Sequence, residues 1–325
     1  MNDVALRSRV VPVAMATTFT AFMLVSLQIR GIGELVERGA SPIAVAGTTQ
    51  LLQGLVTALL ILSLPALRAG VARAASGVRS GAVPVWTLAG GLAGALQIAV
   101  MGLVSPVIGV AALTVLLVSG QTANGLVVDR TGLTPGGKRA ITPARVGGAM
   151  LAVVAVGLVW WGSESSASGG AAWWAVVLAV VAGAGAAVQA ALNGRVAQVA
   201  GQPVVAAEVN FLGGATVMWL LVGAFALLGS RQSPLPDVGS AWLYGSTIFG
   251  LLLIVNSAWA VKHLGVLLLS LVGVVGQISG AILVDFFLPL PGSAFAWTLV
   301  LSLAVSVVAV AVAAFARRSA ALVRS

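Results

Sequence analysis

Charged residues are scarce in this sequence, and their scarcity excludes a water-soluble fold. Only 8% of the 325 residues are charged and 59% are hydrophobic, whereas a soluble domain carries about a quarter charged residues. The 17 Lys and Arg outnumber the 8 Asp and Glu. They are scattered between apolar runs, however, and do not gather with aromatics into a nucleic-acid-binding patch. We therefore expect an integral membrane protein surrounded by lipid, with no nucleic-acid partner.

Cysteine is absent, and histidine and tyrosine occur once each, as His263 and Tyr244. Without cysteine there is no disulfide framework, no thiolate nucleophile and no zinc knuckle. With a single imidazole and a single phenol, most acid–base and metal chemistry lacks its usual residues. The sequence also has no Walker motif for direct use of ATP. We expect no metal, no cofactor and no enzymatic activity.

Long uncharged runs recur along the chain. A bilayer core about 30 Å thick needs roughly 20 apolar residues at about 1.5 Å of rise each. Two spans are expected within residues 80–128, separated by a break near Ser105-Pro106. The others are expected at 10–29, 42–67, 146–163, 172–193, 203–228, 241–261, 264–287 and 293–316. The prediction is an all-α polytopic membrane protein with ten transmembrane helices.

The basic residues between these spans indicate how the chain crosses the membrane. With the N-terminus placed in the cytoplasm, all of the 17 Lys and Arg except Arg30, Arg38 and Arg231 fall on the inner side. Positively charged loops are retained preferentially in the cytoplasm. The split predicts a multi-pass protein of the cytoplasmic (plasma) membrane with both termini in the cytoplasm.

The two halves of the chain share a sequence pattern in two registers. An offset of 156 pairs Gly120-Gln121 with Gly276-Gln277 and Asp129 with Asp285, and an offset of 161 pairs Gln28 with Gln189 and Pro42 with Pro203. The difference between the offsets falls in the Arg-bearing loop expected between the second and third spans. Because five spans per half is an odd number, the second copy enters the membrane from the opposite face. The predicted units are residues 1–163 and 164–325, related as inverted repeats.

Three segments of the second half carry a family resemblance, together with the Gly-Gln pairs at 120–121 and 276–277. The segments are 189–195 (Gln-Ala-Ala-Leu-Asn-Gly-Arg), 201–203 (Gly-Gln-Pro) and 210–214 (Asn-Phe-Leu-Gly-Gly). The sequence resembles the YdcZ-like branch of the drug/metabolite transporter (DMT) superfamily over nearly its whole length. The resemblance implies a ten-helix, EamA-like carrier with a central cavity between its halves, and it supplies no substrate. The first half departs from the pattern, with Ile32 where an Asn is expected, so the site need not be symmetric.

Glu208 is the acidic residue that we place within a span, about five residues or ~7.5 Å into the seventh helix. A carboxylate there costs on the order of 2.5–3.5 kcal/mol, as insertion scales give for Asp, and such residues usually have a function. One interpretation is a proton-coupling or cation-binding site. The other is that Glu208 is stabilised by the positive N-terminal end of its helix and pairs with Arg195.

Amide side chains within the spans are the remaining polar candidates. Gln189 and Asn193 lie four residues apart and share a helix face, and Asn210 lies near the start of the next helix. Repetition of the pattern adds Gln28, Gln121 and Gln277. Either these amides line a shared substrate pocket, or each bonds a neighbouring helix.

Three residues near helix ends complete the candidates. Asp129 and Asp285 end their helices, where the helix dipole disfavours an acid. For Asp129, beside Arg130, a solvated end or turn cap is favoured, whereas Asp285 has no basic neighbour in sequence and stays a site candidate. Trp259 either borders a cavity or packs in the span, and His263 is expected at the membrane interface.

An inverted repeat around a central site favours a secondary transporter that moves a small metabolite or drug-like solute by alternating access. Proton coupling through Glu208 is an open part of this hypothesis. One alternative is an intramembrane enzyme, which would need a nucleophile and a base in one cavity. Another is a structural or assembly protein without transport. A channel is less favoured, because no ring of like charges occurs in the spans. The expected partner is a small-molecule substrate, with the chain as a monomer or homodimer.

Overall fold

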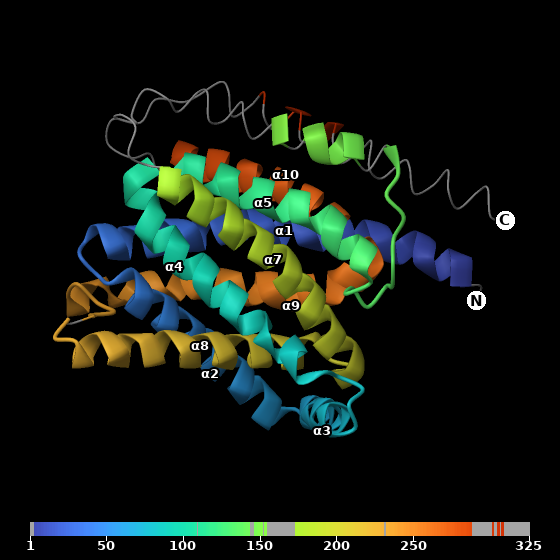
Figure 1. Cartoon of the computed structure of the whole chain (residues 1–325), viewed down its shortest axis with the longest axis horizontal. Helices are drawn as coiled ribbons and strands as arrows, with labels where there is room; N and C mark the ends of the chain where they lie inside the picture. The colour runs from blue at the N-terminus through green and yellow to red at the C-terminus, as the bar shows by residue number, and fades with distance from the viewer. Residues whose placement is uncertain are drawn as a thin grey trace.

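The computed structural model describes residues 3–108, 110–143, 146–151, 153–154, 173–230 and 232–287, and also 301, 304, 305, 307 and 308. The regular elements in these residues are all helices (Figure 1). They are α1 (Asp3–Glu37), α2 (Pro42–Ser63), α3 (Pro65–Arg79), η1 (Val85–Ala89), α4 (Gly90–Ile108), α5 (Val110–Thr131), α7 (Trp173–Ala200), α8 (Pro203–Leu227), η3 (Val238–Ser246), α9 (Thr247–Leu264) and α10 (Val266–Phe287). The all-α class predicted from the sequence is confirmed.

Seven of the described helical segments are long and apolar enough to cross a membrane. They are Val10–Glu37, Pro42–Ser63, Val85–Val104, Trp173–Ala200, Pro203–Leu227, Val238–Leu264 and Val266–Val284. Each falls on an expected span, and the expected fourth span is the 22-residue helix α5. The spans expected at 146–163 and 293–316 fall largely outside the described residues. Large apolar side chains such as Leu62, Leu220 and Trp242 are exposed on the bundle, as on a surface that faces lipid.

The segment that follows α2 is a helix, and the expectation of a loop there was wrong. Helix α3 begins with Pro65 at its first position, where the missing backbone N–H would have no intrahelical partner in any case. Its face toward the bundle buries Leu67, Gly70 and Gly77, whereas Arg68 is exposed. A charged helix of this kind has no long apolar run, and only its helical period reveals it.

Two helices also end further along the chain than the sequence predicts. Helix α4 continues through Ser105-Pro106 and ends at Ile108. Helix α1 continues past Ile29 to Glu37, and its added turns hold Glu34, which forms an ion pair with Arg38. Charged residues can extend a helix beyond the apolar core of a span, because its end reaches water.

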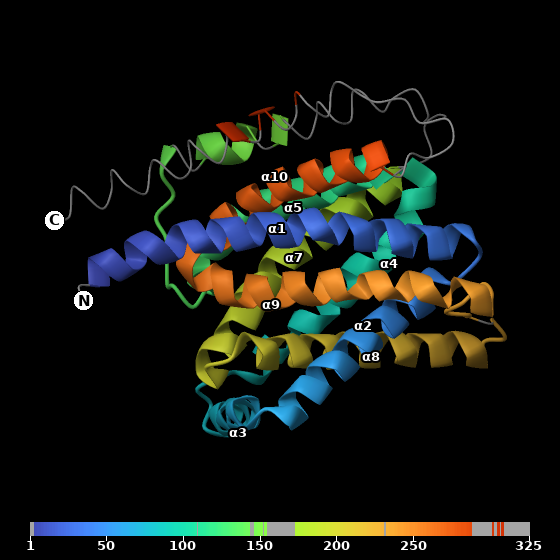
Figure 2. The same ribbon diagram turned by 180° about the vertical axis from the view of Figure 1, so that it is seen from behind.

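The long helices form one bundle in which helices distant in sequence pack together. Helix α1 packs against α9 and α10, and α7 packs against α4 and α5. Figure 2 shows α1 between α10 and α9, with α2 and α8 beside each other below them. One buried apolar cluster joins α1, α9 and α10 around Leu267 and Leu271. Helix α3 is seen end-on in both views, so it runs across the end of the bundle where α2 finishes, which we call the α3 end (Figures 1 and 2).

Glycines allow two of these helix pairs to meet backbone to backbone. A Cβ atom at Gly120 of α5 would lie 2.0 Å from the carbonyl oxygen of Val180 in α7. A Cβ atom at Gly276 of α10 would lie 2.3 Å from the carbonyl oxygen of Phe19 in α1. Small residues permit such close approach between membrane helices. The two contacts correspond, because the offset of 156 relates the glycines and the offset of 161 relates Phe19 to Val180.

Arginines at the α3 end bind the carbonyl groups of other segments. Arg73 of α3 donates two hydrogen bonds, of 2.9 and 2.6 Å, to the carbonyl of Ala200, the last residue of α7. Arg195 donates to the carbonyl of Leu133 at 2.7 Å, and Arg139 donates to the last turn of α9 at 3.2 Å. Cations offset the partial negative charge at helix C-termini. These bonds place three arginines of the expected cytoplasmic side at the same end of the bundle.

Candidate functional site

A cavity lies at the centre of the bundle, and α1, α2, α4, α5, α7, α8, α9 and α10 all contribute to its wall. Its empty space, including the part open to solvent, is about 690 Å³. The polar side chains on the wall are eight amides: Gln28, Gln50, Gln53, Gln97, Gln121, Gln189, Asn210 and Gln277. Apolar side chains form the rest of the wall. Within the described part of the chain, no charged side chain lines this cavity.

Five of the amides expected from the sequence therefore lie around one space. They are Gln28, Gln121, Gln189, Asn210 and Gln277, and the helices that carry them come from both halves of the chain. Four of them are the pairs that the two offsets relate, Gln28 with Gln189 and Gln121 with Gln277. The residues that the two offsets pair thus line one cavity.

Hydrogen bonds hold the amides on the α7–α8 side. The Nε2 atom of Gln189 donates to Oδ1 of Asn210 at 2.8 Å, and Nδ2 of Asn193 donates to the same oxygen at 3.1 Å. All three side chains are buried. Asn193 therefore supports the wall through Asn210 without lining the cavity itself. The three amides join α7 to α8, and two of them, Gln189 and Asn210, also line the cavity.

A glycine in each half packs against an amide side chain of the other half. A Cβ atom at Gly94 of α4 would lie 2.5 Å from Nε2 of Gln189. In the corresponding place, a Cβ atom at Gly250 of α9 would lie 2.0 Å from Oε1 of Gln28. Any larger residue at either glycine would have to displace the amide. The shape of the cavity thus depends on both glycines.

Three of the amides on the wall were not expected from the sequence: Gln50, Gln53 and Gln97. The Nε2 atom of Gln53 donates to the carbonyl of Thr247 at 2.7 Å, which holds α2 against the start of α9. A signal was available in α2, where Gln50, Gln53 and Thr57 are spaced by three and four residues and share a helix face. Gln97 gave no comparable signal, because its helix has no other amide.

Two of the amides have buried atoms without a hydrogen-bond partner in the protein. They are Oε1 of Gln28 and both Oε1 and Nε2 of Gln50. These side chains are only 5% and 1% exposed. Buried polar groups are nearly always paired, and an unpaired one costs about 1–3 kcal/mol. These atoms lie against glycines of neighbouring helices: a Cβ atom at Gly214 would lie 1.8 Å from Oε1 of Gln50, and one at Gly250 would lie 2.0 Å from Oε1 of Gln28.

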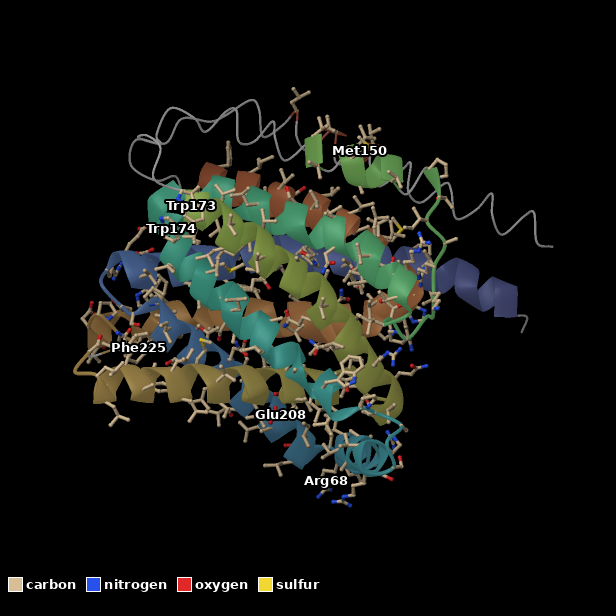
Figure 3. All side chains as sticks on the ribbon, viewed as in Figure 1. Arg68, Met150, Trp173, Trp174, Glu208 and Phe225 are labelled. Carbon is tan, nitrogen blue, oxygen red and sulfur yellow. The ribbon has the colours of Figure 1, made fainter. Side chains whose placement is uncertain are left out.

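Glu208 does not line the cavity. It is half-buried on α8 where that helix packs against α2, and its carboxylate accepts a hydrogen bond from the hydroxyl of Thr57. Figure 3 shows Glu208 toward the α3 end, the same end as Arg68, with Phe225 at the other end. Arg195 donates instead to the carbonyls of Gly132 and Leu133. Between the described residues, no Glu208–Arg195 ion pair forms.

Asp129 is buried, and the interpretation as a solvated helix end was wrong. Its carboxylate accepts hydrogen bonds from the backbone N–H groups of Val266 at 2.8 Å and Leu267 at 3.3 Å. These are the first residues of α10, which follows the turn at Gly265, where φ is 77°. An acid at a helix N-terminus satisfies free N–H groups and complements the dipole. Asp129 is therefore a cap, but of α10 and not of its own helix.

Trp259 is not among the described residues that line the cavity. Trp259 packs on the cluster around α10, with its ring centroid 5.3 Å from that of His263. Its neighbour Asn256 donates to the hydroxyl of Thr18 at 3.1 Å, which joins α9 to α1. Asp285 lies in the last turn of α10, and its side chain is outside the described part of the structure. In the residues that are described, no three His, Cys, Asp or Glu side chains gather as metal ligands would.

This chain matches one family model and several solved structures. The family described as "Putative inner membrane exporter, YdcZ" matches residues 13–158 and 174–312, which is most of the chain. Among solved structures, one described as "Crystal structure of protein" is 21% identical, covers 94% of this chain and 98% of its own, and has a TM-score of 0.61. At that identity the likeness establishes the fold alone. No curated protein sequence matches.

Proposed function

The chain belongs to the YdcZ family of the drug/metabolite transporter superfamily, which is described as "Putative inner membrane exporter, YdcZ". From this premise we propose a specific mode of action. The protein is a secondary transporter that exports a small metabolite or drug-like solute by alternating access. The observation that carries the proposal is the central cavity, whose wall combines eight amides with apolar side chains drawn from both halves. Binding sites of transporters with this kind of repeat lie where the halves meet.

The transporter is proposed to have ten helices, as two inverted repeats at residues 1–163 and 164–325, with both termini in the cytoplasm. Matching contacts between the halves support the repeat. Helix α1 packs on α9 and α10 as α7 packs on α4 and α5. Gly120 meets Val180 as Gly276 meets Phe19, and Gly94 meets Gln189 as Gly250 meets Gln28. Two such copies can exchange conformations, which opens the same cavity to either side in turn.

The chemistry of the cavity favours binding over catalysis. Along its described wall there is no hydroxyl, thiol, imidazole or carboxylate side chain. An intramembrane enzyme needs a nucleophile and a base within reach of one substrate atom. Amides donate and accept hydrogen bonds but neither attack nor take up a proton at ordinary pH. The wall therefore supports a carrier that releases its solute unchanged.

Coupling to protons is proposed to occur at Glu208, beside the cavity. The hydroxyl of Thr57 has a single proton, and its oxygen lies next to the Glu208 carboxylate and 3.1 Å from the carbonyl oxygen of Gln53. A charged carboxylate accepts a hydrogen bond from the Thr57 hydroxyl. A protonated carboxyl instead donates a hydrogen bond to the Thr57 oxygen, which leaves the hydroxyl proton free to bond the Gln53 carbonyl. Because Gln53 lines the cavity, protonation at Glu208 would alter the turn of α2 that carries a cavity residue.

Tracer counterflow in liposomes tests the proposed function. Solutes that raise the melting temperature of the purified protein are loaded unlabelled, and uptake of the labelled solute from outside is followed over time. A transporter gives transient accumulation of the chemically unchanged labelled solute, driven by the preloaded unlabelled solute and without any imposed ion gradient. A Gly94→Leu variant, which fills the place of the Gln189 amide, should lose accumulation, whereas Gly223→Leu on an open face of α8 should keep it. Chemical conversion of the solute, or equal accumulation in liposomes that lack the protein, would exclude the proposal.

A further inference from the structure

Helix α3 changes the direction of the chain at the point where α2 leaves the membrane. It begins at Pro65, two residues after α2 ends at Ser63. Figures 1 and 2 both show it end-on, across the end of helices that run along the bundle. Leu62 and Leu64, at the junction of the two helices, are 68% and 49% exposed, as in a segment that still touches lipid. Helix α3 therefore lies along the membrane surface, at the depth of the phospholipid headgroups.

The positive charge of α3 is not neutralised within the described part of the protein. The helix carries Arg68, Arg73 and Arg79 and has no acidic residue. In the sequence, no Asp or Glu occurs anywhere from 38 to 128. Arg73 is engaged by the carbonyl of Ala200. Arg68 and Arg79 are exposed, and neither forms an ion pair with another described residue.

Arg68 and Arg79 share one side of α3. They are eleven residues apart, which is about three helical turns and roughly 16 Å along the axis. Leu67, Gly70 and Gly77 lie on the opposite side and are buried against the bundle. Figure 3 shows Arg68 beyond α3, on the side away from the other helices. The two guanidinium groups therefore face the surroundings of the bundle.

The headgroup of an anionic phospholipid has the chemistry that this side of α3 requires. A guanidinium group donates two parallel hydrogen bonds to phosphate oxygens, and its charge complements theirs. Val71, one turn after Arg68, is 40% exposed and adds an apolar contact beside the cations. Helices that lie in a membrane interface combine basic and apolar side chains in this way.

We propose that Arg68 and Arg79 form a binding surface for the headgroups of anionic phospholipids, which holds the α3 end at the membrane surface. The spacing of the two arginines places them on two neighbouring lipids. The proposal goes beyond the transport function and stands without it, because it requires only that the bundle lies in a bilayer. Each arginine should raise the affinity for the anionic lipid about fivefold, as a basic residue near an anionic surface does.

Thermal unfolding of the purified full-length chain in an uncharged detergent tests the preference for anionic lipid. The probes are phosphatidylglycerol and phosphatidylcholine with the same acyl chains, titrated into the micelles. A ligand that binds the folded state raises the melting temperature in a concentration-dependent way, which yields an affinity. Phosphatidylglycerol should bind more tightly than phosphatidylcholine, and added salt should reduce the difference, because it screens exposed charges. Equal affinity for the two lipids would overturn the proposal.

Matched charge-removing variants locate the surface. Arg68→Gln and Arg79→Gln should each weaken phosphatidylglycerol binding about fivefold, and together roughly 25-fold. Arg38→Gln removes the same charge from a guanidinium group that already pairs with Glu34, and should leave the affinity unchanged. Arg68→Lys keeps the charge and should keep most of the affinity, which separates lost attraction from lost folding. Unchanged affinity in the double variant, or an equal loss in Arg38→Gln, would refute the role of α3.

Inorganic phosphate separates a lipid surface from a site for a soluble anion. At the same phosphate concentration it should raise the melting temperature far less than phosphatidylglycerol, since it has no acyl chains to hold it in the micelle. Stabilisation by inorganic phosphate that equals that by phosphatidylglycerol, and that is lost in the double variant, would assign the two arginines to a soluble anion and overturn the lipid proposal.

Discussion

A single methyl group added at Gly120 or at Gly276 tests how the two halves of the bundle are joined. Each glycine faces a backbone carbonyl of another helix, that of Val180 for Gly120 and that of Phe19 for Gly276. A backbone carbonyl cannot rotate away as a side chain does. Alanine at position 120 therefore pushes α5 away from α7, and alanine at position 276 pushes α10 away from α1.

The size of the effect follows from the distances. The added Cβ would lie 2.0 Å from the oxygen at Gly120 and 2.3 Å at Gly276, whereas ordinary contact begins at 3.4 Å. The helices must part by roughly 1 Å, which also loosens the neighbouring contacts, and overpacking of this kind costs about 1–3 kcal/mol. Alanine is the better helix former by about 1 kcal/mol, which offsets part of the loss. The expected net destabilisation is up to about 2 kcal/mol for each variant.

The assay is reversible unfolding in mixed micelles, followed by circular dichroism. Gly223→Ala is the control, because a Cβ atom at Gly223 meets nothing within 4 Å on the exposed face of α8. This variant should gain up to about 1 kcal/mol from helix propensity alone. The free energy of unfolding should therefore fall by similar amounts in the two test variants and rise in the control. Stabilisation at Gly120 or Gly276 equal to that at Gly223 would refute the close backbone packing.

Further predictions concern the cap, the carboxylate and the orientation of the chain. Asp129→Ala should lower the free energy of unfolding by about 2–5 kcal/mol, because two buried N–H groups of α10 lose their acceptor, whereas Asp237→Ala at an exposed cap should cost about 1 kcal/mol; equal losses would contradict the capping of α10. Glu208→Gln should abolish transport driven by an imposed pH gradient while counterflow persists, and coupling that is unchanged at all pH values would exclude Glu208 as the coupling site. A reporter fused to the C-terminus should be active in the cytoplasm, and activity outside the cell would overturn the assigned orientation.

Much of the architecture could be predicted from the sequence, because both of its main signals are local. An apolar run long enough to cross a bilayer has few alternatives to a helix, and each candidate span of the structure falls on a predicted one. The residue pairs that the two registers relate, Gln28 with Gln189 and Gln121 with Gln277, also line one cavity. A residue pattern that recurs in both halves carries information about their packing.

What could not be predicted depends on which helices meet. Asp129 caps α10, which lies more than a hundred residues further along the chain. Its neighbours in the sequence therefore suggested a different role. Glu208 points to Thr57 on α2, and nothing near it in sequence places it outside the cavity. Gln50 and Gln53 are singled out in the sequence only by their shared helix face. Helix α3 lacked an apolar run and required a search for helical period.

The absence of cysteine from the chain allows the central claim, alternating access to one cavity, to be measured directly. A single cysteine replaces Gln97 in the cavity wall, with Ser76→Cys on α3 and Ser233→Cys between α8 and η3 as exposed controls. Each variant is treated with a membrane-impermeant maleimide in right-side-out and in inverted vesicles. Alternating access predicts that Ser76→Cys reacts only from the cytoplasmic side, Ser233→Cys only from the outside, and Gln97→Cys from either side. Labelling of Gln97→Cys from one side alone, or of both controls from the same side, would contradict it.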